Sequence, residues 1–187
     1  MGIENYLDNQ FLIAMPTLDD PNFSKVVTVV CQHGEDGALG IVVNRRADMQ
    51  LGELLEQLEI KVISPEIAQQ PIFVGGPVQQ DRGFVLHELC EEYDSSYAVA
   101  DNLRLTTSRD VLEAIAEGRG PRRALVALGY AGWSSGQLEE ELKDNAWLST
   151  EVNLDLLFDT PCDERWEAAT GLLGFDPRAL ASYAGHA

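Results

Sequence analysis

The amino-acid sequence predicts a mixed α/β fold, built as one domain over residues 1–187. This length suits a single compact unit with a sizeable hydrophobic core. Short apolar segments rich in β-branched residues alternate with segments of helical periodicity, which is typical of proteins that contain both strands and helices. Turn residues that signal hairpins recur between the strands. The sheet is therefore expected to be mixed rather than purely parallel.

The first third of the chain predicts three strands and one helix. Residues 11–15 form a short apolar strand, and a polar turn follows at residues 19–22. Residues 26–43 contain two strands separated by turn residues, and this pattern predicts a β-hairpin. Leucines then recur at helical spacing between residues 51 and 58, with glutamates on the opposite side, which predicts an amphipathic helix.

The middle third predicts four short strands. They cover residues 71–74, 83–87, 97–100 and 103–106, and a turn at Asp81 and Arg82 precedes the second of them. The segment from Glu88 to Ser96 is polar and acidic, so it has little apolar surface whose burial could offset the entropy of ordering it. We therefore expect this segment to be mobile.

The last third predicts a central strand among several helices. A helix begins after an N-cap at Thr107 or Ser108 and ends before Gly118. Residues 124–130 form a buried strand, and a glycine-rich turn then leads into a helix that places leucines inward and glutamates outward. Apolar spacing between residues 156 and 173 predicts one or two C-terminal helices.

Acidic side chains dominate the charge of the chain. The sequence holds 31 Asp and Glu against 13 Lys and Arg, a formal net charge of −18 that both halves of the chain share. Proteins that bind nucleic acids need a surplus of basic side chains at the phosphates, and anionic membranes attract basic segments in the same way. The charge therefore argues against direct binding to nucleic acid or to membranes. No apolar run approaches the roughly 20 residues that span a bilayer.

The cysteines indicate a cytoplasmic protein. Cys31, Cys90 and Cys162 are odd in number and far apart, without a C-x-x-C pair. This pattern fits reduced thiols better than a disulfide framework. The first eight residues carry two acids and no base, whereas a secretory signal begins with basic residues.

Cys31 and His33 lie two residues apart on a predicted strand, so their side chains are expected on the same face. A Cys–His pair can hold a thiolate ready for nucleophilic or redox chemistry, which makes Cys31 a candidate reactive thiol. The alternative is a buried, inert cysteine beside a histidine in a turn. The histidines and cysteines show none of the paired spacings of zinc ligands, and no metal or other cofactor is predicted.

Two glycine-rich segments follow predicted strands and could offer backbone N–H groups to a ligand. The first, at residues 75–77, precedes Arg82, which could bind a carboxylate or a phosphate or could simply pair with a neighbouring acid. The second, at residues 129–136, precedes a helix N-terminus, where an anion could bind. Its spacing matches neither the dinucleotide-binding nor the P-loop fingerprint. Tight turns and close packing, with Trp133 filling a corner, are the alternative explanation.

Many of these segments together resemble the AlgH/YqgE family of bacterial proteins. In chain order they are residues 11–16, 20–23, 37–44, 75–78, 81–87, 107–110, 128–133, 136–139, 165–166 and 184–187. Two positions depart from the family pattern, since Gln32 stands where members usually have Glu and Arg46 where Pro is common. The resemblance implies a single mixed α/β domain with a branched, partly barrel-like sheet flanked by helices. It also implies a cytosolic protein of unknown biochemical function, described at best as a transcriptional regulator, and it assigns no catalytic residue.

These observations leave two functional hypotheses. The first is a cytosolic interaction or regulatory protein without catalysis, which acts through a protein partner and regulates transcription, if at all, only indirectly. The alternative is a small-molecule or nucleotide-binding protein, or an enzyme, whose site lies where the two glycine-rich segments meet in one concave pocket. Its candidate ligand-binding residues are Gly75, Gly76, Arg82, His87, Gly129, Tyr130, Gly132 and Trp133.

Overall fold

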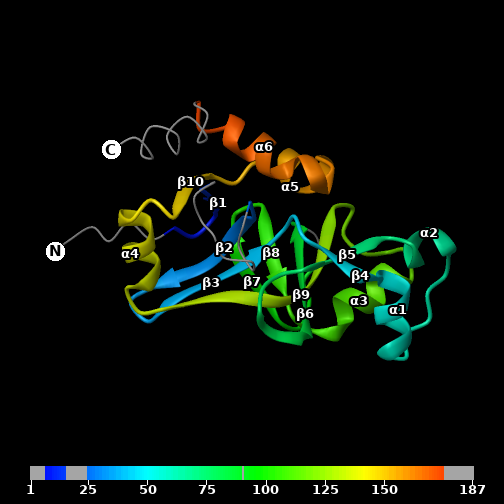
Figure 1. Ribbon diagram of the computed structural model, residues 1–187. Coiled ribbons are helices and arrows are strands. Elements are labelled where there is room, and N and C mark those ends of the chain that lie inside the picture. The colour runs from blue at the N-terminus through cyan, green and yellow to red at the C-terminus, as the bar shows by residue number, and fades with distance from the viewer. Residues whose placement is uncertain (1–6, 16–24, 90, 175–187) are drawn as a thin grey trace.

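The computed structural model describes residues 7–15, 25–89 and 91–174, and these residues form ten strands and six α-helices (Figure 1). The strands are β1 (Gln10–Ala14), β2 (Val27–Gly34), β3 (Gly37–Val42), β4 (Arg46–Gln50), β5 (Pro71–Val74), β6 (Val78–Glu88), β7 (Ser96–Ala100), β8 (Leu103–Thr106), β9 (Ala124–Ser134) and β10 (Trp147–Glu151). The helices are α1 (Leu51–Gln57), α2 (Pro65–Ala68), α3 (Arg109–Ala116), α4 (Gln137–Lys143), α5 (Leu154–Asp159) and α6 (Arg165–Gly171), with a 3₁₀ turn, η1 (Cys162–Glu164), between the last two. The turn expected at residues 19–22, Cys90 and residues 184–187 lie outside the described residues.

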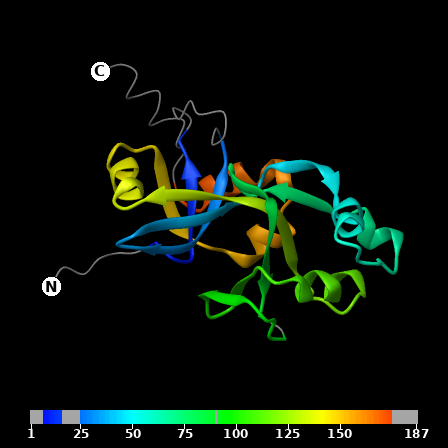
Figure 2. The ribbon, with the colours of Figure 1, turned by 90° about the horizontal axis from the view of Figure 1, so that it is seen from below.

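The strands belong to one branched sheet, and the mixed α/β class is confirmed. The main path of the sheet is β10–β1–β2–β3–β9–β6–β8–β7, while β4 and β5 branch from β9. Neighbouring strands are antiparallel, apart from the parallel pair of β5 and β9. The sheet curls, so that β7 at one end of the path comes close to β2. The result is a half-barrel flanked by helices (Figures 1 and 2).

β9 is the branch point because it changes partners along its length. Ala127 and Leu128 pair with β6 on one edge and with β5 on the other, whereas from Ala131 onward β3 takes the place of β5. Gly129 lies at the change of partner with a φ of +79°, a conformation that glycine adopts without strain. The strand therefore continues to Ser134, and the prediction of a glycine-rich turn directly after residue 130 was wrong.

A second predicted turn is also part of a strand. β6 runs without interruption through Asp81 and Arg82, and its register against β9 shifts between Val78 and Gly83. This irregularity is a bulge rather than a chain reversal. The segment before β7, expected to be mobile, is tied to the start of α3, because the N–H of Ser95 donates to Ser108 at 3.0 Å and the N–H of Asp94 donates to Asp110 at 2.8 Å.

Most of the remaining elements match their predictions. The hairpins of β2 with β3 and of β7 with β8 are present, as are α1, α3, α4 and two C-terminal helices. Ser108 is the N-cap residue of α3, although its hydroxyl donates to Asp110 at 2.5 Å instead of capping the backbone. The short strand β4 and the single-turn helix α2 were not predicted.

Three hydrophobic clusters hold the helices against the sheet. α5 and α6 cover the concave face with Leu156, Leu157 and Trp166. α1 and α3 pack on the opposite face of β5, β6 and β9, and α4 covers the far end of β1, β2 and β9. Figure 1 shows these three groups above, to the right and to the left of the sheet, so the region between the β2–β3 and β7–β8 hairpins lies between the groups of helices.

Candidate functional site

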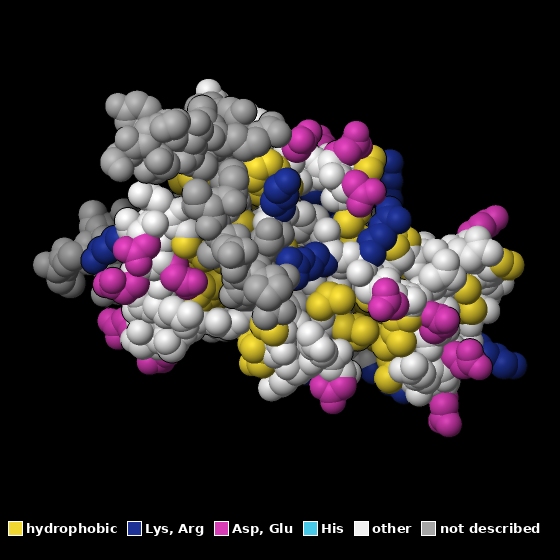
Figure 3. Space-filling model, viewed as in Figure 1, with side chains coloured by type: hydrophobic (Ala, Val, Ile, Leu, Met, Phe, Trp, Pro, Cys, Tyr) yellow, Lys and Arg dark blue, Asp and Glu magenta, His cyan; other side chains and the backbone are white. Residues whose placement is uncertain are grey.

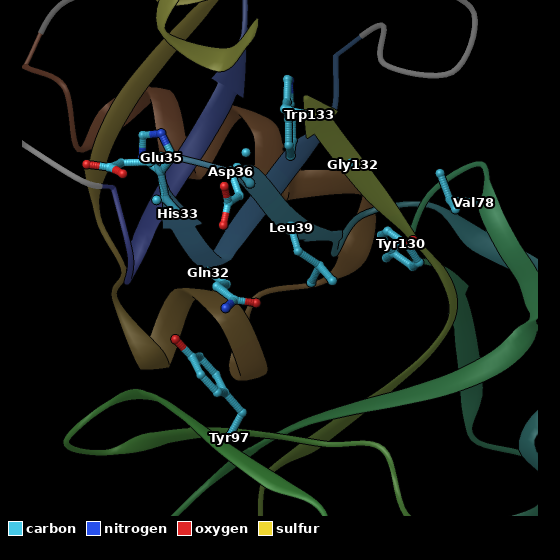
Figure 4. A pocket seen from close by; sticks show the side chains of 13 residues that line it. Gln32, His33, Glu35, Asp36, Leu39, Val78, Tyr97, Tyr130, Gly132 and Trp133 are labelled. Carbon is cyan, nitrogen blue, oxygen red and sulfur yellow. The ribbon is translucent and has the colours of Figure 1, made fainter. Parts of the chain in front are cut away.

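A cleft of about 680 Å³ lies between the β2–β3 hairpin, the end of β9 and the β7 strand (Figure 4). We call it the hairpin cleft. Its lining side chains are Gln32, Glu35, Asp36, Leu39, Val78, Tyr97 and Tyr130, with Gly132 and the edges of His33 and Trp133. The cleft is open to solvent and draws its residues from segments that are far apart in the chain.

The floor of the cleft follows from the side-chain alternation of strands. Tyr130 and Gly132 lie two residues apart on β9 and therefore face the same side of the sheet. Leu39 on β3 is the cross-strand partner of Gly132. A Cβ atom at Gly132 would lie 3.4 Å from the Tyr130 ring, so the glycine leaves room for that ring. The floor is thus apolar and aromatic.

Tyr97 forms the opposite wall of the cleft. Its side chain extends from β7 toward Gln32 and remains 43% exposed, which is unusual for a large aromatic residue (Figure 4). Partial burial raises the pKa of the Tyr97 phenol, and the negative charge of Asp8 raises it further. The phenol therefore stays protonated at neutral pH and can donate a hydrogen bond.

His33 lies at the edge of the cleft with both ring nitrogens engaged. Nδ1 accepts a hydrogen bond from the N–H of Leu7 at 2.9 Å, and Nε2 donates to the carboxylate of Glu139 on α4. The backbone N–H can only donate, so Nδ1 must be the unprotonated nitrogen. Burial disfavours the charge of Glu139, but hydrogen bonds from its own backbone and from His33 outweigh that effect and lower the pKa of this carboxyl. His33 thus has no free lone pair with which to act as a base in the cleft.

Cys31 lies fully buried behind the cleft. Its Sγ is 3.6 Å from the carbonyl oxygen of Val29, to which the thiol donates. Burial raises the pKa of the Cys31 thiol far above its ordinary value, and the charge of Asp8 adds to this effect. The thiolate needed for nucleophilic or redox chemistry is therefore strongly disfavoured, and the geometry supports the alternative of a buried, inert cysteine.

The two glycine-rich segments meet, but their backbones fill the space between them. The N–H of Gly75 donates to the carbonyl of Leu128 at 2.7 Å. A Cβ atom on Gly76 would lie 2.0 Å from the carbonyl carbon of Tyr130, and one on Gly129 would lie 2.6 Å from the carbonyl oxygen of Gly76. These three glycines permit a close backbone approach between the two segments.

The other candidate residues are placed apart from one another. Trp133 points to the face of β9 opposite Tyr130, where its ring packs edge-to-face on Trp147 at 6.0 Å. Arg82 is exposed beside a small pocket of about 170 Å³ at the start of α3, with its guanidinium 5.3 Å from the Phe84 ring. Arg82 forms no ion pair with any described residue. His87 is 1% exposed.

The anion site considered before α4 is not favoured by the structure. The N-cap of this helix is Gly136, and its first turn carries Glu139 and Glu140. These carboxylates already interact with the positive end of a short helix. Among the described residues, no three His, Cys, Asp or Glu gather in a group that could hold a metal ion. None of the helices in the described ranges is long and apolar enough to cross a membrane.

Sequence reasoning missed Gln32, Leu39 and Tyr97 as members of the cleft. They lie on two hairpins whose strands are separated by more than 50 residues, and nothing local shows that the hairpins face each other. The one local indication is Tyr97 itself, a large aromatic residue beside the polar segment 88–96.

Known proteins resemble this chain along its whole length. The profile of the family described as AlgH-like (DUF179) matches residues 11–178. A UPF0301 protein of Thioalkalivibrio sulfidiphilus is 53% identical over 187 residues, covering all of both chains, and one of Nitrosococcus oceani is 50% identical over 97% of each chain. The solution structure of the AlgH protein from Pseudomonas aeruginosa superposes with a TM-score of 0.80 at 48% identity, covering 100% of this chain and 99% of that one. A Corynebacterium diphtheriae protein, at 19% identity and a TM-score of 0.70 over 89% and 86% of the two chains, shares the fold.

Proposed function

The chain belongs to the AlgH-like family, whose biochemical function is unknown, and from this premise we propose that it is a cytosolic binding protein without catalysis. The hairpin cleft takes a basic segment of a protein partner, and any effect on transcription passes through that partner rather than through DNA. The observation that carries the proposal is the meeting of Tyr97, Tyr130 and the acidic turn at Glu35 and Asp36 in one open cleft.

The chemistry of the cleft matches a Lys or Arg side chain. An aromatic ring attracts a cation placed over its face, and carboxylates at the rim supply charge-assisted hydrogen bonds. The apolar side chains of Leu39 and Val78 can contact the methylene stem of such a residue. The neutral phenol of Tyr97 can donate to a backbone carbonyl of the bound segment. Each part of the cleft thus has a counterpart in a basic peptide.

The charge of the whole chain supports the same class of partner. A net charge of −18 attracts basic proteins and repels nucleic acids. Acidic side chains lie at both ends of the face shown in Figure 3. Glu35 and Asp36 project from the tip of the β2–β3 hairpin, where both are exposed to solvent and accessible to a partner.

The hydrogen bonding of His33 favours binding over catalysis. It is the histidine that borders the cleft, and both of its ring nitrogens are engaged by Leu7 and Glu139. General acid–base catalysis needs a group that can exchange a proton with the ligand. The contacts of His33 instead hold the β2–β3 hairpin against α4 and fix one wall of the cleft.

Site-specific photo-crosslinking tests this proposal in a bacterium that carries the protein. A benzophenone amino acid at position 97 should crosslink a protein through a Lys- or Arg-rich segment. The same amino acid at Ile63, which is 66% exposed at the other end of the molecule, should not capture it. Recovery of the same proteins at both positions, or crosslinked segments without basic residues, would contradict the proposal.

A charge-matched pair of variants then tests the cleft with the crosslinked segment as a synthetic peptide. Glu35→Gln with Asp36→Asn should weaken its binding about thirtyfold, since two charge-assisted contacts of about 1 kcal/mol each contribute about 2 kcal/mol together. Glu56→Gln with Glu59→Gln removes the same charge from the region of α1 and should change binding less than twofold. Equal effects of the two pairs in fluorescence anisotropy would show that only the net charge matters and not the cleft.

A further inference from the structure

A chain of three hydrogen-bonded side chains joins β6, β8 and β7 on the face of β7 opposite the cleft. Nε2 of His87 lies 2.6 Å from Oγ1 of Thr106, and that oxygen lies 2.7 Å from Oγ of Ser96. On the other side of the ring, Nδ1 of His87 lies 2.8 Å from the carbonyl oxygen of Glu88. The strand register holds the set together, because Ser96 is the cross-strand partner of Thr106.

The direction of every hydrogen bond follows from the Glu88 carbonyl. This oxygen can only accept, so Nδ1 carries the ring proton and Nε2 of the neutral imidazole is an acceptor. Thr106 must therefore donate its hydroxyl proton to His87. Its oxygen is then free to accept, and Ser96 donates its hydroxyl proton to Thr106. The proton of Ser96 thus has a continuous path to a base.

The two ends of this path differ in their access to solvent. His87 and Thr106 are buried, with exposed fractions of 1% and 0%, whereas Ser96 is exposed on the edge strand β7. Among the described residues, the ring of Tyr93 packs edge-to-face on His87 at 5.5 Å, and the positive charge of Arg104 also acts on this imidazole. Burial lowers the pKa of His87 and the charge of Arg104 lowers it further, although the Glu88 carbonyl opposes them. The imidazole is therefore unprotonated at neutral pH, as a proton acceptor must be.

We propose that Ser96 is a nucleophilic serine that accepts an acyl group from an activated carboxylic ester, with His87 as the base that it reaches through Thr106. The bond from Ser96 Oγ to the acyl carbon forms while the bond from that carbon to the leaving oxygen breaks. The Ser96 proton passes to Thr106 as the Thr106 proton passes to Nε2 of His87, and the leaving group departs as an anion. An uncharged ester suits a protein with a net charge of −18, which repels phosphoryl donors.

The chain offers a serine that serves as an internal control. Ser135 is also exposed, and its hydroxyl donates to the carbonyl of Glu35 at 2.5 Å. A backbone carbonyl can accept a hydrogen bond but cannot take up the proton at neutral pH. Ser135 therefore resembles Ser96 in being exposed and in donating a hydrogen bond, but its acceptor leads to no base, so the ratio of their acylation rates tests the contribution of His87.

The test uses the full chain, p-nitrophenyl acetate at pH 7.5 and mass spectrometry of the digested protein to measure acetylation of each serine over time. A base in proton contact with a nucleophile raises rates by roughly 10²–10⁴. Ser96 should therefore be acetylated at least about tenfold faster than Ser135, even with a relay that transmits only part of the effect. The rate should fall on acidification as His87 becomes protonated, below the ordinary histidine pKa of 6.5.

Variants of Thr106 separate the relay from a structural role. Thr106→Val keeps the shape but removes the hydroxyl, so Ser96 should fall to the rate of Ser135, and Thr106→Ser should restore it. Circular dichroism shows that each variant is folded before its rate is compared. Equal rates at Ser96 and Ser135 in the unchanged chain would overturn the proposal, as would a folded Thr106→Val variant that retains the fast rate at Ser96.

Discussion

Replacement of Gly76 by alanine tests the close approach of β5 and β9 on which the branched sheet depends. A Cβ atom at this position would lie 2.0 Å from the carbonyl carbon of Tyr130 and 2.1 Å from its oxygen. Ordinary van der Waals contact begins at about 3.4 Å, so one backbone must move by about 1.4 Å. The nearest atoms are all main-chain atoms, so no side-chain rotation can relieve the overlap.

The magnitude follows from the hydrogen bonds that such a shift disrupts. The carbonyl of Gly75 accepts from Val42 at 2.8 Å, and its N–H donates to Leu128 at 2.7 Å. A buried polar group left without its partner costs about 1–3 kcal/mol, so Gly76→Ala should lower the free energy of unfolding by roughly 3–5 kcal/mol. For a domain of this size, that corresponds to a fall in Tm of roughly 10 °C.

Two other glycines provide matched controls in urea denaturation followed by circular dichroism. Gly136 has a φ of +78° with open space around its Cβ position, so Gly136→Ala should cost only about 1–2 kcal/mol of backbone strain. Gly83 has neither a positive φ nor a neighbour within 4 Å, and Gly83→Ala should be neutral or stabilise by up to about 1 kcal/mol. A Gly76→Ala variant that loses no more stability than Gly136→Ala would refute the steric argument.

Three further predictions concern buried polar and titratable groups. Arg165→Met should lower the free energy of unfolding, measured by urea titration, by about 2–4 kcal/mol. The buried guanidinium donates hydrogen bonds to the carbonyls of Val43 and Thr160, and the variant leaves both carbonyls without this donor. A loss below about 1 kcal/mol would contradict this reasoning. Cys31 should react with a maleimide at least about 100-fold more slowly in the native state than in urea, because burial disfavours its thiolate. Site-resolved mass spectrometry measures both rates, and equal rates would show that the thiol is accessible in the folded protein. Because the pKa of His87 is lowered in the folded state, the unfolded state binds protons more readily, and stability should fall as the pH drops through 6.5. His87→Gln should weaken this dependence between about pH 7 and pH 5, and an unchanged slope would show that other groups cause it.

The elements that sequence reasoning placed correctly are those with local causes. β2 begins with a run of β-branched residues, a turn of glycines and acidic residues separates it from β3, and α1 shows its leucines at helical spacing. The errors occurred where a strand changes partner. Glycines in β9 and Asp81 with Arg82 in β6 indicate turns when read locally. In the structure β9 pairs with β3, β5 and β6, and the pairing of β6 with β9 continues on both sides of Asp81 and Arg82. That information is tertiary, and no local pattern contains it.

The candidate site was less accessible to sequence reasoning for a related reason. Tyr130 was predicted as a lining residue because it lies in the glycine-rich segment 129–136, and it does line the cleft, whereas Trp133 in the same segment faces the other side of β9. Period-two alternation separates these two residues once the segment is known to be a strand. The partners of Tyr130 across the cleft come from another hairpin, and only the curl of the sheet brings Tyr97 toward them.

The same alternation makes the two proposed activities separable on β7. Ser96 and Tyr97 are adjacent, so their side chains lie on opposite faces of the strand, one bonded to Thr106 and the other lining the cleft. Tyr97→Ala should abolish peptide binding and leave acetylation of Ser96 unchanged, whereas Ser96→Ala should do the reverse. A folded single variant that removed both activities would contradict the placement of the cleft and the relay on opposite faces of β7.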